Sequence, residues 1–544
     1  MDLIFYNGRV TTLDDSRPFA EAVGVKNGLI AFVGTNRKLS SYKTGKTLAI
    51  DLKGKTMLPG FNDSHLHLAG YALTSAKVDL RDCRNIDQVV DTVKSYIVFH
   101  SIKPGDWVLG WGWDHGLFEE RRMPDRRDLD RATSEHCLVI MRTCCHICSI
   151  NTRALMKAGI FESQPYVEGG SIVQDDQGIP TGILKENAMN LVMDLVPGLN
   201  KEMLKKLIFK AVQDFVSAGL TSVQTDDLAA LGSDMLPTLL DSYRELELEG
   251  NLPLRINLQL LLPEITDLDK FIKEGYRNYY NSDFFKTGPL KILADGSIGG
   301  RTAFLSEPYY DTGDSCGVAI YQEDELTELV KMAYLNGMQV ATHAIGDAAI
   351  NMVLDTYEQV LSINSHHDPR FRIVHASIVD DHALYRFKTL GIIADIQPSF
   401  IPTDNSLIDQ HLGPRRASWT YRWKDFISNG IRVGGGSDAP VETYEPLAGI
   451  SAAVTRQNKS GKPTGGWHPD QRLTLHEALN LYTSGSAFCS FDENMKGTIT
   501  PGKFADLLVL SEDIAKVEPK NIRDVKCEMT VVDGKIVYEN QGSG

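Results

Sequence analysis

Apolar and polar positions divide the chain into two strand-rich ends and a long middle in which strands and helices alternate. Residues 3–34 show short alternating runs, and Asn27-Gly28 within them is typical of a tight hairpin turn. Residues 505–540 repeat this pattern, with Asp533-Gly534 at the turn. We therefore expect the two ends to pair into one small β-sandwich.

The middle of the chain predicts a parallel sheet of βα units. From residue 201 onward, segments with helical periodicity alternate with short apolar runs, which is typical of βαβ connectivity. The predicted strands are residues 220–225, 254–262, 290–295, 339–346, 371–377, 392–398 and 431–439. Together with the apolar run 57–63 they make eight, a number that favours a closed (β/α)8 TIM barrel.

These elements predict five segments along the chain. They are residues 1–56 and 486–544 as the two parts of the β-sandwich, 57–72 as the first barrel strand with a metal motif, 73–200 as an insertion, and 201–485 as the rest of the barrel. Insertions on βα loops lie over the active end of such barrels. We expect residues 73–200 to form an inserted cap region over the active site.

Composition excludes several classes of partner. The chain is 42% hydrophobic and 23% charged, which is typical of a soluble globular protein, and its net charge of -15 argues against nucleic acid. No apolar run is long enough for a membrane span, and the first residues lack the features of a signal peptide. Eight cysteines do not indicate a disulfide framework. We expect a cytoplasmic protein with a small-molecule substrate and leave homo-oligomerisation open.

Metal-ligand residue types recur at the ends of the predicted barrel strands, where barrel active sites lie. The first strand ends in the H-x-H pair, whose two side chains share one face of a strand. The set comprises His65, His67, Lys291, His343, His375 and Asp438. Neutral imidazoles together with a carboxylate suit a divalent ion such as zinc.

Lys291 is the unusual member of this set, because an ammonium group repels a cation. Desolvation and nearby positive charge lower the pKa of a buried lysine, and the neutral amine can then add carbon dioxide to form an anionic carbamate. Alternatively, the Lys291 stem lies along the barrel and its head reaches water. The residue chemistry leaves both readings open.

Longer motifs place these residues in a known family. They are PGFNDSHLH, GWGWD, GGSIVQDDQGIPTGILKENA, LKILADGSIGGRTA, ATHAIGDAA, RIVHAS, GSDAPVE, AAVTRQ and GTITPGKFADLLVL. In these motifs the chain resembles the amidohydrolase superfamily, and specifically its YtcJ-like branch, which includes N-substituted formamide deformylases. The resemblance runs from about residue 2 to residue 540. These motifs are specific for the family, but they do not identify the substrate.

The resemblance implies a ligand set and a reaction. His65, His67 and Asp438 would hold one ion, His343 and His375 a second, and a carbamylated Lys291 would bridge them, although some relatives use a single ion. Metal-activated hydroxide would attack a substrate carbonyl. Asp438 would carry the proton to the departing nitrogen, so that a non-peptide, amide-type carbon–nitrogen bond is hydrolysed.

Six further residues are candidates for substrate contact. His146, supported by Asn151, lies in the insertion, and a structural histidine is the alternative. Glu186 and Arg301 are candidates that could equally be ordinary ion-pair partners. Gln224 stands where relatives often have a histidine, and Gln397 ends the predicted seventh strand.

Two other functions compete with this reading. A deaminase with one metal ion would use a glutamate shortly after the strand-five histidine, whereas here Asp347 follows His343. A non-catalytic sensor on a barrel scaffold would have lost ligands, and none is missing from the set. We therefore expect an amidohydrolase.

Overall fold

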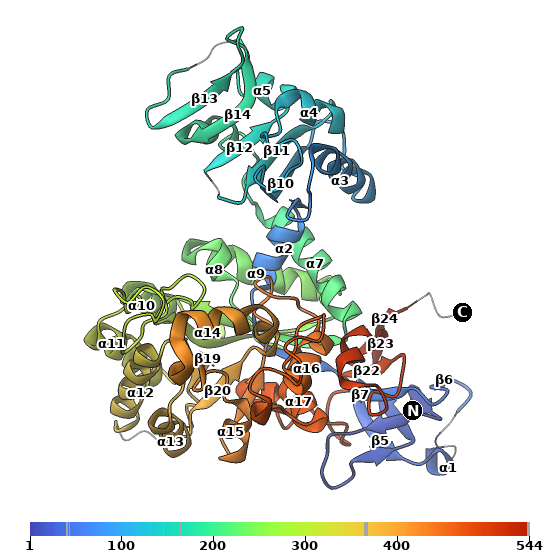
Figure 1. The fold of residues 1–544 in the computed structure, drawn as a ribbon. Coiled ribbons are helices and arrows are strands. Elements are labelled where there is room, and N and C mark those ends of the chain that lie inside the picture. The colour runs from blue at the N-terminus through green and yellow to red at the C-terminus, as the bar shows by residue number, and fades with distance from the viewer. Residues whose placement is uncertain (40–41, 43, 145, 163–164, 364–367, 541–544) are drawn as a thin grey trace. The chain divides into compact units, whose positions relative to one another are not determined.

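A computed structural model describes residues 1–39, 42, 44–144, 146–162, 165–363 and 368–540. The chain divides into two units, residues 1–71 with 208–544 and residues 72–207. Each unit has its own β-structure (Figure 1) and its own buried hydrophobic clusters.

The first unit contains a nearly closed barrel of eight parallel strands whose spatial order follows the chain. The strands are β8 (Phe61–Leu66), β15 (Leu220–Thr225), β16 (Arg255–Leu261), β17 (Phe285–Leu293), β18 (Val340–Ala344), β19 (Arg372–His375), β20 (Ile393–Ile396) and β21 (Val433–Gly435). Beyond β21 the chain returns to β8, where Asp438 N donates to His65 O at 2.8 Å. This confirms the predicted eight-strand parallel barrel.

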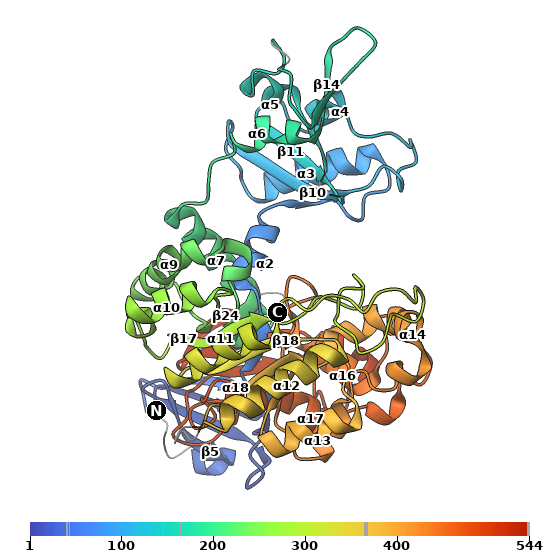
Figure 2. The same cartoon turned by 90° about the vertical axis from the view of Figure 1, so that its left-hand side faces the viewer.

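Helices cover the outside of the barrel. Figure 2 shows α11, α12 and α13 side by side along its outer surface. The helices are α2 (Leu68–Ser75), α7 (Lys201–Ser217), α8 (Leu228–Leu231), α9 (Leu236–Leu248), α10 (Ile265–Lys273), α11 (Glu323–Leu335), α12 (Asp347–Leu361), α13 (Asp381–Leu390), α14 (Ile401–Ala417), α15 (Trp423–Ser428), α16 (Pro446–Thr455), α17 (Leu475–Asn480) and α18 (Ser486–Cys489). Their apolar faces pack on strands whose residues are mostly buried, as in other parallel sheets.

The predicted bounds of the first barrel strand, residues 57–63, are wrong. The run divides at Gly60 into β7 (Thr56–Pro59), which joins another sheet, and β8, which opens the barrel. Gly60 N donates to Asp506 O, and a Cβ at this position would lie 2.2 Å from Thr221 Oγ1. A side chain at position 60 would collide with Thr221, so only glycine fits at the point where the chain passes from one sheet to the next.

The strands at the two ends of the chain form two further sheets in the first unit. One has the order β5-β4-β1-β6 and the other β24-β23-β22-β7-β2-β3. Their bounds are β1 (Leu3–Tyr6), β2 (Arg9–Thr11), β3 (Phe19–Ala20), β4 (Ala22–Lys26), β5 (Leu29–Gly34), β6 (Leu48–Asp51), β22 (Leu507–Leu510), β23 (Cys527–Val532) and β24 (Lys535–Glu539), with α1 (Asn36–Leu39) after β5. The second sheet unites both ends, because β22 pairs with β7.

Both predicted hairpin turns are present in these sheets. β4 and β5 pair antiparallel around Asn27 and Gly28, and β23 and β24 pair around Asp533 and Gly534. All four turn residues have positive φ, between 52° and 74°. That geometry belongs to the two-residue turn whose twist matches the strands it joins. Local turn chemistry alone therefore located these two hairpins.

The second unit is built on one six-stranded sheet of order β13-β14-β12-β11-β10-β9. Its elements are β9 (Val78–Asp79), β10 (Trp107–Trp113), β11 (Cys137–Arg142), β12 (Ile147–Ile150), β13 (Gly170–Gln174), β14 (Pro180–Glu186), α3 (Ile86–Phe99), α4 (Arg126–Ala132), α5 (Thr152–Lys157) and α6 (Asn190–Met193). Two buried clusters lie in this unit, one of which contains Trp113 and Phe118. Residues 72–207 therefore have a core of their own.

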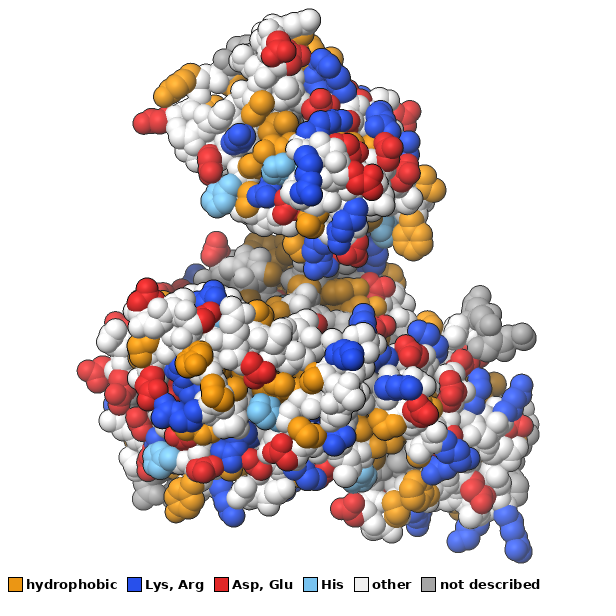
Figure 3. All heavy atoms as spheres, in the orientation of Figure 1, with side chains coloured by type: hydrophobic (Ala, Val, Ile, Leu, Met, Phe, Trp, Pro, Cys, Tyr) orange, Lys and Arg blue, Asp and Glu red, His pale blue; other side chains and the backbone are white. Residues whose placement is uncertain are grey.

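Surface and covalent features agree with the composition. The face in Figure 3 carries acidic and basic side chains interspersed with one another. The seven cysteines that the structure describes are free thiols. Within the described ranges, no helix combines the length and the apolarity needed to cross a membrane.

Candidate metal centre

The C-terminal ends of the barrel strands bring His65, His67 and Asp438 together. His65 lies near the end of strand β8, His67 directly follows this strand, and Leu66 between them is buried. His67 Nε2 lies 3.0 Å and His65 Nε2 3.3 Å from Asp438 Oδ1. One ligand atom from each of the three lies within 4.8 Å of the others. This spacing suits a single bound ion.

The other predicted ligands adjoin this trio. Lys291 from β17 places Nζ 3.5 Å from His65 Nε2. The ring of His375, the last residue of β19, lies 5.8 Å from the His65 ring and 4.5 Å from the His343 ring, measured between centroids. All six predicted ligands thus lie at one end of the barrel.

Two glutamine side chains fix the protons of two histidines. Gln259 Nε2 donates to Ser64 O, so its Oε1 is oriented to accept a bond from His65 Nδ1 at 3.0 Å. Gln397 does the same for His375, since its Nε2 donates to Asp395 O and its Oε1 lies 2.7 Å from His375 Nδ1. An amide oxygen only accepts, so each Nδ1 carries the proton. The Nε2 lone pairs of His65 and His375 are therefore free for a ligand.

Backbone carbonyls do the same for the other two histidines. His67 Nδ1 lies 2.7 Å from Asp226 O, and His343 Nε2 lies 3.1 Å from Gly296 O. His67 therefore has its Nε2 and His343 its Nδ1 available as a ligand atom. Metal-binding histidines in proteins have this arrangement, with the second nitrogen donating to a fixed acceptor. The four histidines thus fit a divalent metal.

Burial and neighbouring charge set the ionisation of the cluster. Burial, together with Lys291, lowers the pKa of His65 to about 4, so this imidazole is neutral at pH 7. Burial also lowers the pKa of Lys291. For His67, burial disfavours the cation, but the hydrogen bond and charge of Asp438 outweigh it and raise the pKa to about 9. Without a metal, a proton therefore resides between His67 and Asp438, where a cation would replace it.

Asp63 joins the two segments that carry the trio. Its carboxylate accepts bonds from His65 N at 3.0 Å and from Ser437 N at 3.0 Å. Asp438, the next residue, has φ 59°, and His375 has φ 72°. Positive φ is uncommon for such residues and concentrates at functional sites, where surrounding contacts maintain it. Asp63 provides such contacts beside Asp438.

Three of the residues predicted to contact substrate lie in the same unit as the cluster. Arg301 pairs with Asp311 at 2.6 Å, and His411 Nδ1 lies 2.7 Å from that carboxylate. Gln224 is buried, and its amide accepts from Arg372 and donates to Ser486 O. Gln397 positions His375. Both ends of the Gln224 amide are thus engaged within the barrel, and substrate contact by Gln224 stays a prediction.

The remaining three lie in the second unit. His146 Nδ1 lies 2.9 Å from Glu186 Oε2, and both side chains are exposed. Glu186 has φ 50° and ψ −133°, a region that non-glycine residues rarely adopt. Asn151 is buried, caps α5 and bonds three other backbone groups of its unit, and its predicted support of His146 stays a prediction. Substrate contact by His146 and Glu186 stays a prediction.

The barrel and its ligand cluster define a class of protein, the metal-dependent hydrolases built on a (β/α)8 barrel. The amidohydrolase family model matches residues 48–538, which is most of the chain. The chain therefore belongs to the amidohydrolase family and is a metal-dependent hydrolase acting on carbon–nitrogen bonds.

Individual relatives cover nearly all of the chain. YtcJ of Bacillus subtilis (strain 168) is 34% identical over 540 residues, which is 99% of this chain and 100% of that protein. The N-substituted formamide deformylase of Arthrobacter pascens is 29% identical over 100% of this chain and 99% of its own length. The crystal structure of an uncharacterized metal-dependent hydrolase from Pyrococcus furiosus superimposes with TM-score 0.73 at 30% identity, covering 94% of this chain and 99% of that one.

Sequence reasoning missed the acceptors that orient the histidines. Gln259 lies in the predicted strand LRINLQLLL, where it alternates with the polar residues Arg255 and Asn257, so the pattern does not distinguish it from them. Asp63 lies two residues before His65 and shares its face of the strand. The carbonyls of Asp226 and Gly296 carry no signal in the sequence, because every residue has one.

Proposed function

We propose that this protein hydrolyses an amide-type, non-peptide carbon–nitrogen bond of a small molecule. One observation carries the proposal: four histidines each have one nitrogen occupied by a fixed acceptor and the other directed away from it, next to a lysine and an aspartate. Such a pre-oriented set is costly to build and suits a catalytic metal centre.

In this proposal, two zinc ions bind the cluster. His65, His67 and Asp438 would hold one, His343 and His375 would hold the other, and Lys291, carbamylated at Nζ, would contribute an anionic ligand to both. When bound, such ions supply a nucleophile from water and polarise a carbonyl oxygen. The burial of Lys291 and its lowered pKa support the carbamate, which forms from the neutral amine.

Asp438 acts as the proton carrier. Despite burial, its pKa lies well below the usual range because the neighbouring imidazoles of His65 and His67 favour the anion. The ionised carboxylate can take a proton from the attacking water and deliver it to the departing nitrogen. One water is consumed, and the products are a carboxylate and an amine.

A single-ion deaminase remains the second candidate, because the trio His65, His67 and Asp438 alone meets the spacing of one metal site among the described residues. One ion per chain with release of ammonia from an aminopyrimidine would favour this candidate. Two ions per chain with release of a substituted amine would favour hydrolysis of an amide.

A substrate screen tests the proposal. N-formyl amines, N-acyl amino acids, cyclic amides and carbamates are incubated with the protein loaded with zinc, cobalt or manganese, and amine release is measured. We expect release by the wild type and none by His343→Ala, which should retain its circular dichroism spectrum. Silence of the wild type across the whole panel would contradict the proposal.

Three further expectations from the sequence stay proposals: the β-sandwich, the cap and the cytoplasmic location. We propose that the two terminal sheets pack as a small β-sandwich, supported by a buried cluster that includes Phe5, Val23, Leu507 and Val531 from both ends of the chain. The cap role of residues 73–200 and a cytoplasmic location are likewise proposed from the sequence.

A further inference from the structure

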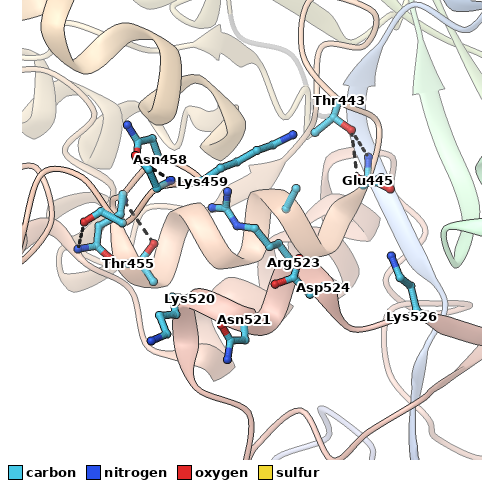
Figure 4. A pocket seen from close by; sticks show the side chains of 14 residues that line it. Thr443, Glu445, Thr455, Asn458, Lys459, Lys520, Asn521, Arg523, Asp524 and Lys526 are labelled. Atoms are coloured by element: carbon cyan, nitrogen blue, oxygen red, sulfur yellow. Dashed lines mark hydrogen bonds between the residues drawn. The ribbon is translucent and has the colours of Figure 1, made fainter.

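We infer that a cavity beside α16, outside the metal centre, binds a small oxyanion such as a phosphate monoester or a dicarboxylate. The cavity has a volume of about 460 Å³ and is bounded by α16, the 3-10 helix η8 (Pro519–Asp524) and residues 457–461 (Figure 4). None of the predicted metal ligands lines it. We call it the anion pocket.

The floor of the anion pocket is a packed helix pair. α16 contributes Ala448 and Thr455, and η8 contributes Arg523 and Lys520. The two helices are joined by a hydrogen bond from Ser451 Oγ to Pro519 O at 3.1 Å. The cations on η8 are therefore carried by an element that is anchored to the barrel helices.

The loop at residues 457–461 is held rigid by its own side chains. Asn458 Oδ1 accepts from Ser460 N and from Lys462 N, both at 3.0 Å. Gln457 Nε2 donates to Gly461 O at 3.1 Å. Lys459 lies within this closed turn. A preformed wall of this kind spares a ligand the entropic cost of ordering it.

The charge of the lining is opposite to that of the protein. Four cations line the anion pocket, against two anions, Glu445 and Asp524. The cations are Lys459, Lys520, Arg523 and Lys526. The whole chain carries a net charge of -15. A local excess of positive charge on an acidic protein is the feature that selects an anionic ligand.

Arg523 is the residue on which the inference depends. It is half-buried, and within the described ranges no carboxylate forms an ion pair with it. Burial lowers the pKa of its guanidinium, with Asp524 opposing this effect. Lys520, in contrast, pairs with Glu518 at 3.1 Å. A partly desolvated cation without a partner is stabilised by an anion that supplies the missing acceptors.

The chemistry of the lining favours oxyanions over other anions. A guanidinium presents paired donors that match two oxygens of a phosphate or carboxylate. Figure 4 shows Arg523 reaching from η8 toward the segment that carries Lys459. The anion pocket therefore contains both the planar guanidinium of Arg523 and the ammonium group of Lys459.

Calorimetric titration of the full-length, metal-loaded protein tests the inference. Phenyl phosphate and succinate are titrated separately. Tighter binding of phenyl phosphate would indicate a phosphate monoester as the ligand, and tighter binding of succinate a dicarboxylate. We expect Arg523→Gln to weaken the tighter probe at least tenfold. Arg523→Lys, which keeps the charge, should weaken it less. Affinity should fall with added salt.

Matched variants locate the binding. Arg472→Gln makes the same charge change outside the lining and should leave the affinity unchanged. If Arg523→Gln does not fold, Lys459→Gln on the exposed loop replaces it, with the same tenfold expectation. Equal affinity in wild type and the pocket variant would place the probe elsewhere and overturn the inference, as would absence of binding at millimolar probe. Neither result bears on amide hydrolysis, which does not use this cavity.

Discussion

The amide of Gln397 determines which nitrogen of His375 is protonated. Its Oε1 lies 2.7 Å from His375 Nδ1, and its Nε2 is committed to Asp395 O, so the amide cannot reverse without losing a bond. The Nε2 of His375 is thereby left as the ligand atom. This relationship makes Gln397 a positioning residue for the metal centre.

Replacing Gln397 tests that role. Gln397→Leu removes the acceptor at similar volume, so His375 can adopt either tautomer and either ring orientation. We expect metal affinity to fall about 10- to 100-fold. Metal content per chain is measured after dialysis against graded chelator, with Gln359→Leu on the exposed face of α12 as control. Full metal retention by Gln397→Leu would show that the bond does not orient His375.

Asp438→Asn should retain the fold and lose activity. The amide has the shape of the carboxylate but cannot carry the proton, so we expect kcat to fall by about 10²- to 10⁴-fold. Amine release on the best substrate of the screen is the measurement. Asp314→Asn, on an exposed loop, is the matched control. Comparable activity in Asp438→Asn would exclude this residue as proton carrier.

Lys291 and Lys496 offer a direct test of the carbamate. Both are buried, and burial lowers the pKa of each. Lys496 pairs with Asp492 at 3.0 Å, whereas within the described part of the chain Lys291 forms no ion pair. We expect ¹³C-labelled carbon dioxide to give one lysine carbamate signal by NMR. It should disappear in Lys291→Ala and persist in Lys496→Met; the reverse pattern would contradict the assignment.

Chelation should abolish activity without unfolding the barrel. The ligands are held by barrel strands, and Asp438 N bonds His65 O independently of any metal. We expect the circular dichroism spectrum to survive chelator treatment, and activity to return with zinc, cobalt or manganese. Activity that persists in the metal-free protein would argue against a metal-dependent reaction.

The acid stability of the protein should depend on Asp492. This carboxylate contacts Lys286 at 2.6 Å and Lys496 at 3.0 Å, and against the effect of burial these lysines lower its pKa to about 2. A pKa lower in the folded state contributes stability above the unfolded value near 3.8. That contribution is lost as the pH falls from about 4 to 2.

Asp492→Asn removes this contribution. We expect it to lower the free energy of unfolding at pH 7 by about 2 kcal/mol. The gap between wild type and variant should close below pH 4. Thermal unfolding across this pH range, with Asp314→Asn as control, provides the measurement. A gap that stays constant down to pH 2 would show that the ionisation of Asp492 is not its source.

The barrel and its ligands were predictable for one physical reason. Parallel strands are buried on both faces, so they are apolar runs, and a histidine or carboxylate at their ends stands out. Strand β15 was predicted at its observed bounds, residues 220–225. Helix α14 was not predicted, because Gly413 and Pro414 interrupt its helical pattern.

Other features depend on contacts between distant segments. Residues 57–63 form one apolar run, and its division at Gly60 follows from Thr221 and Asp506, far away in the chain. The side chain of Gln224 is likewise held by Arg372 and Ser486, which lie far from it in the sequence. Periodicity describes local structure and cannot specify such pairings.

The pairing of β7 with β22 has a consequence for synthesis of the chain. Arg9 in the same sheet bonds Asp513, 504 positions later, so this sheet is completed only after residues 507–539 have left the ribosome. Until then, β7 presents an unpaired edge directly ahead of the strand that carries His65 and His67. Unpaired edges bind other chains readily. During synthesis, the edge of β7 is therefore open to pairing until residues 507–510 have been made.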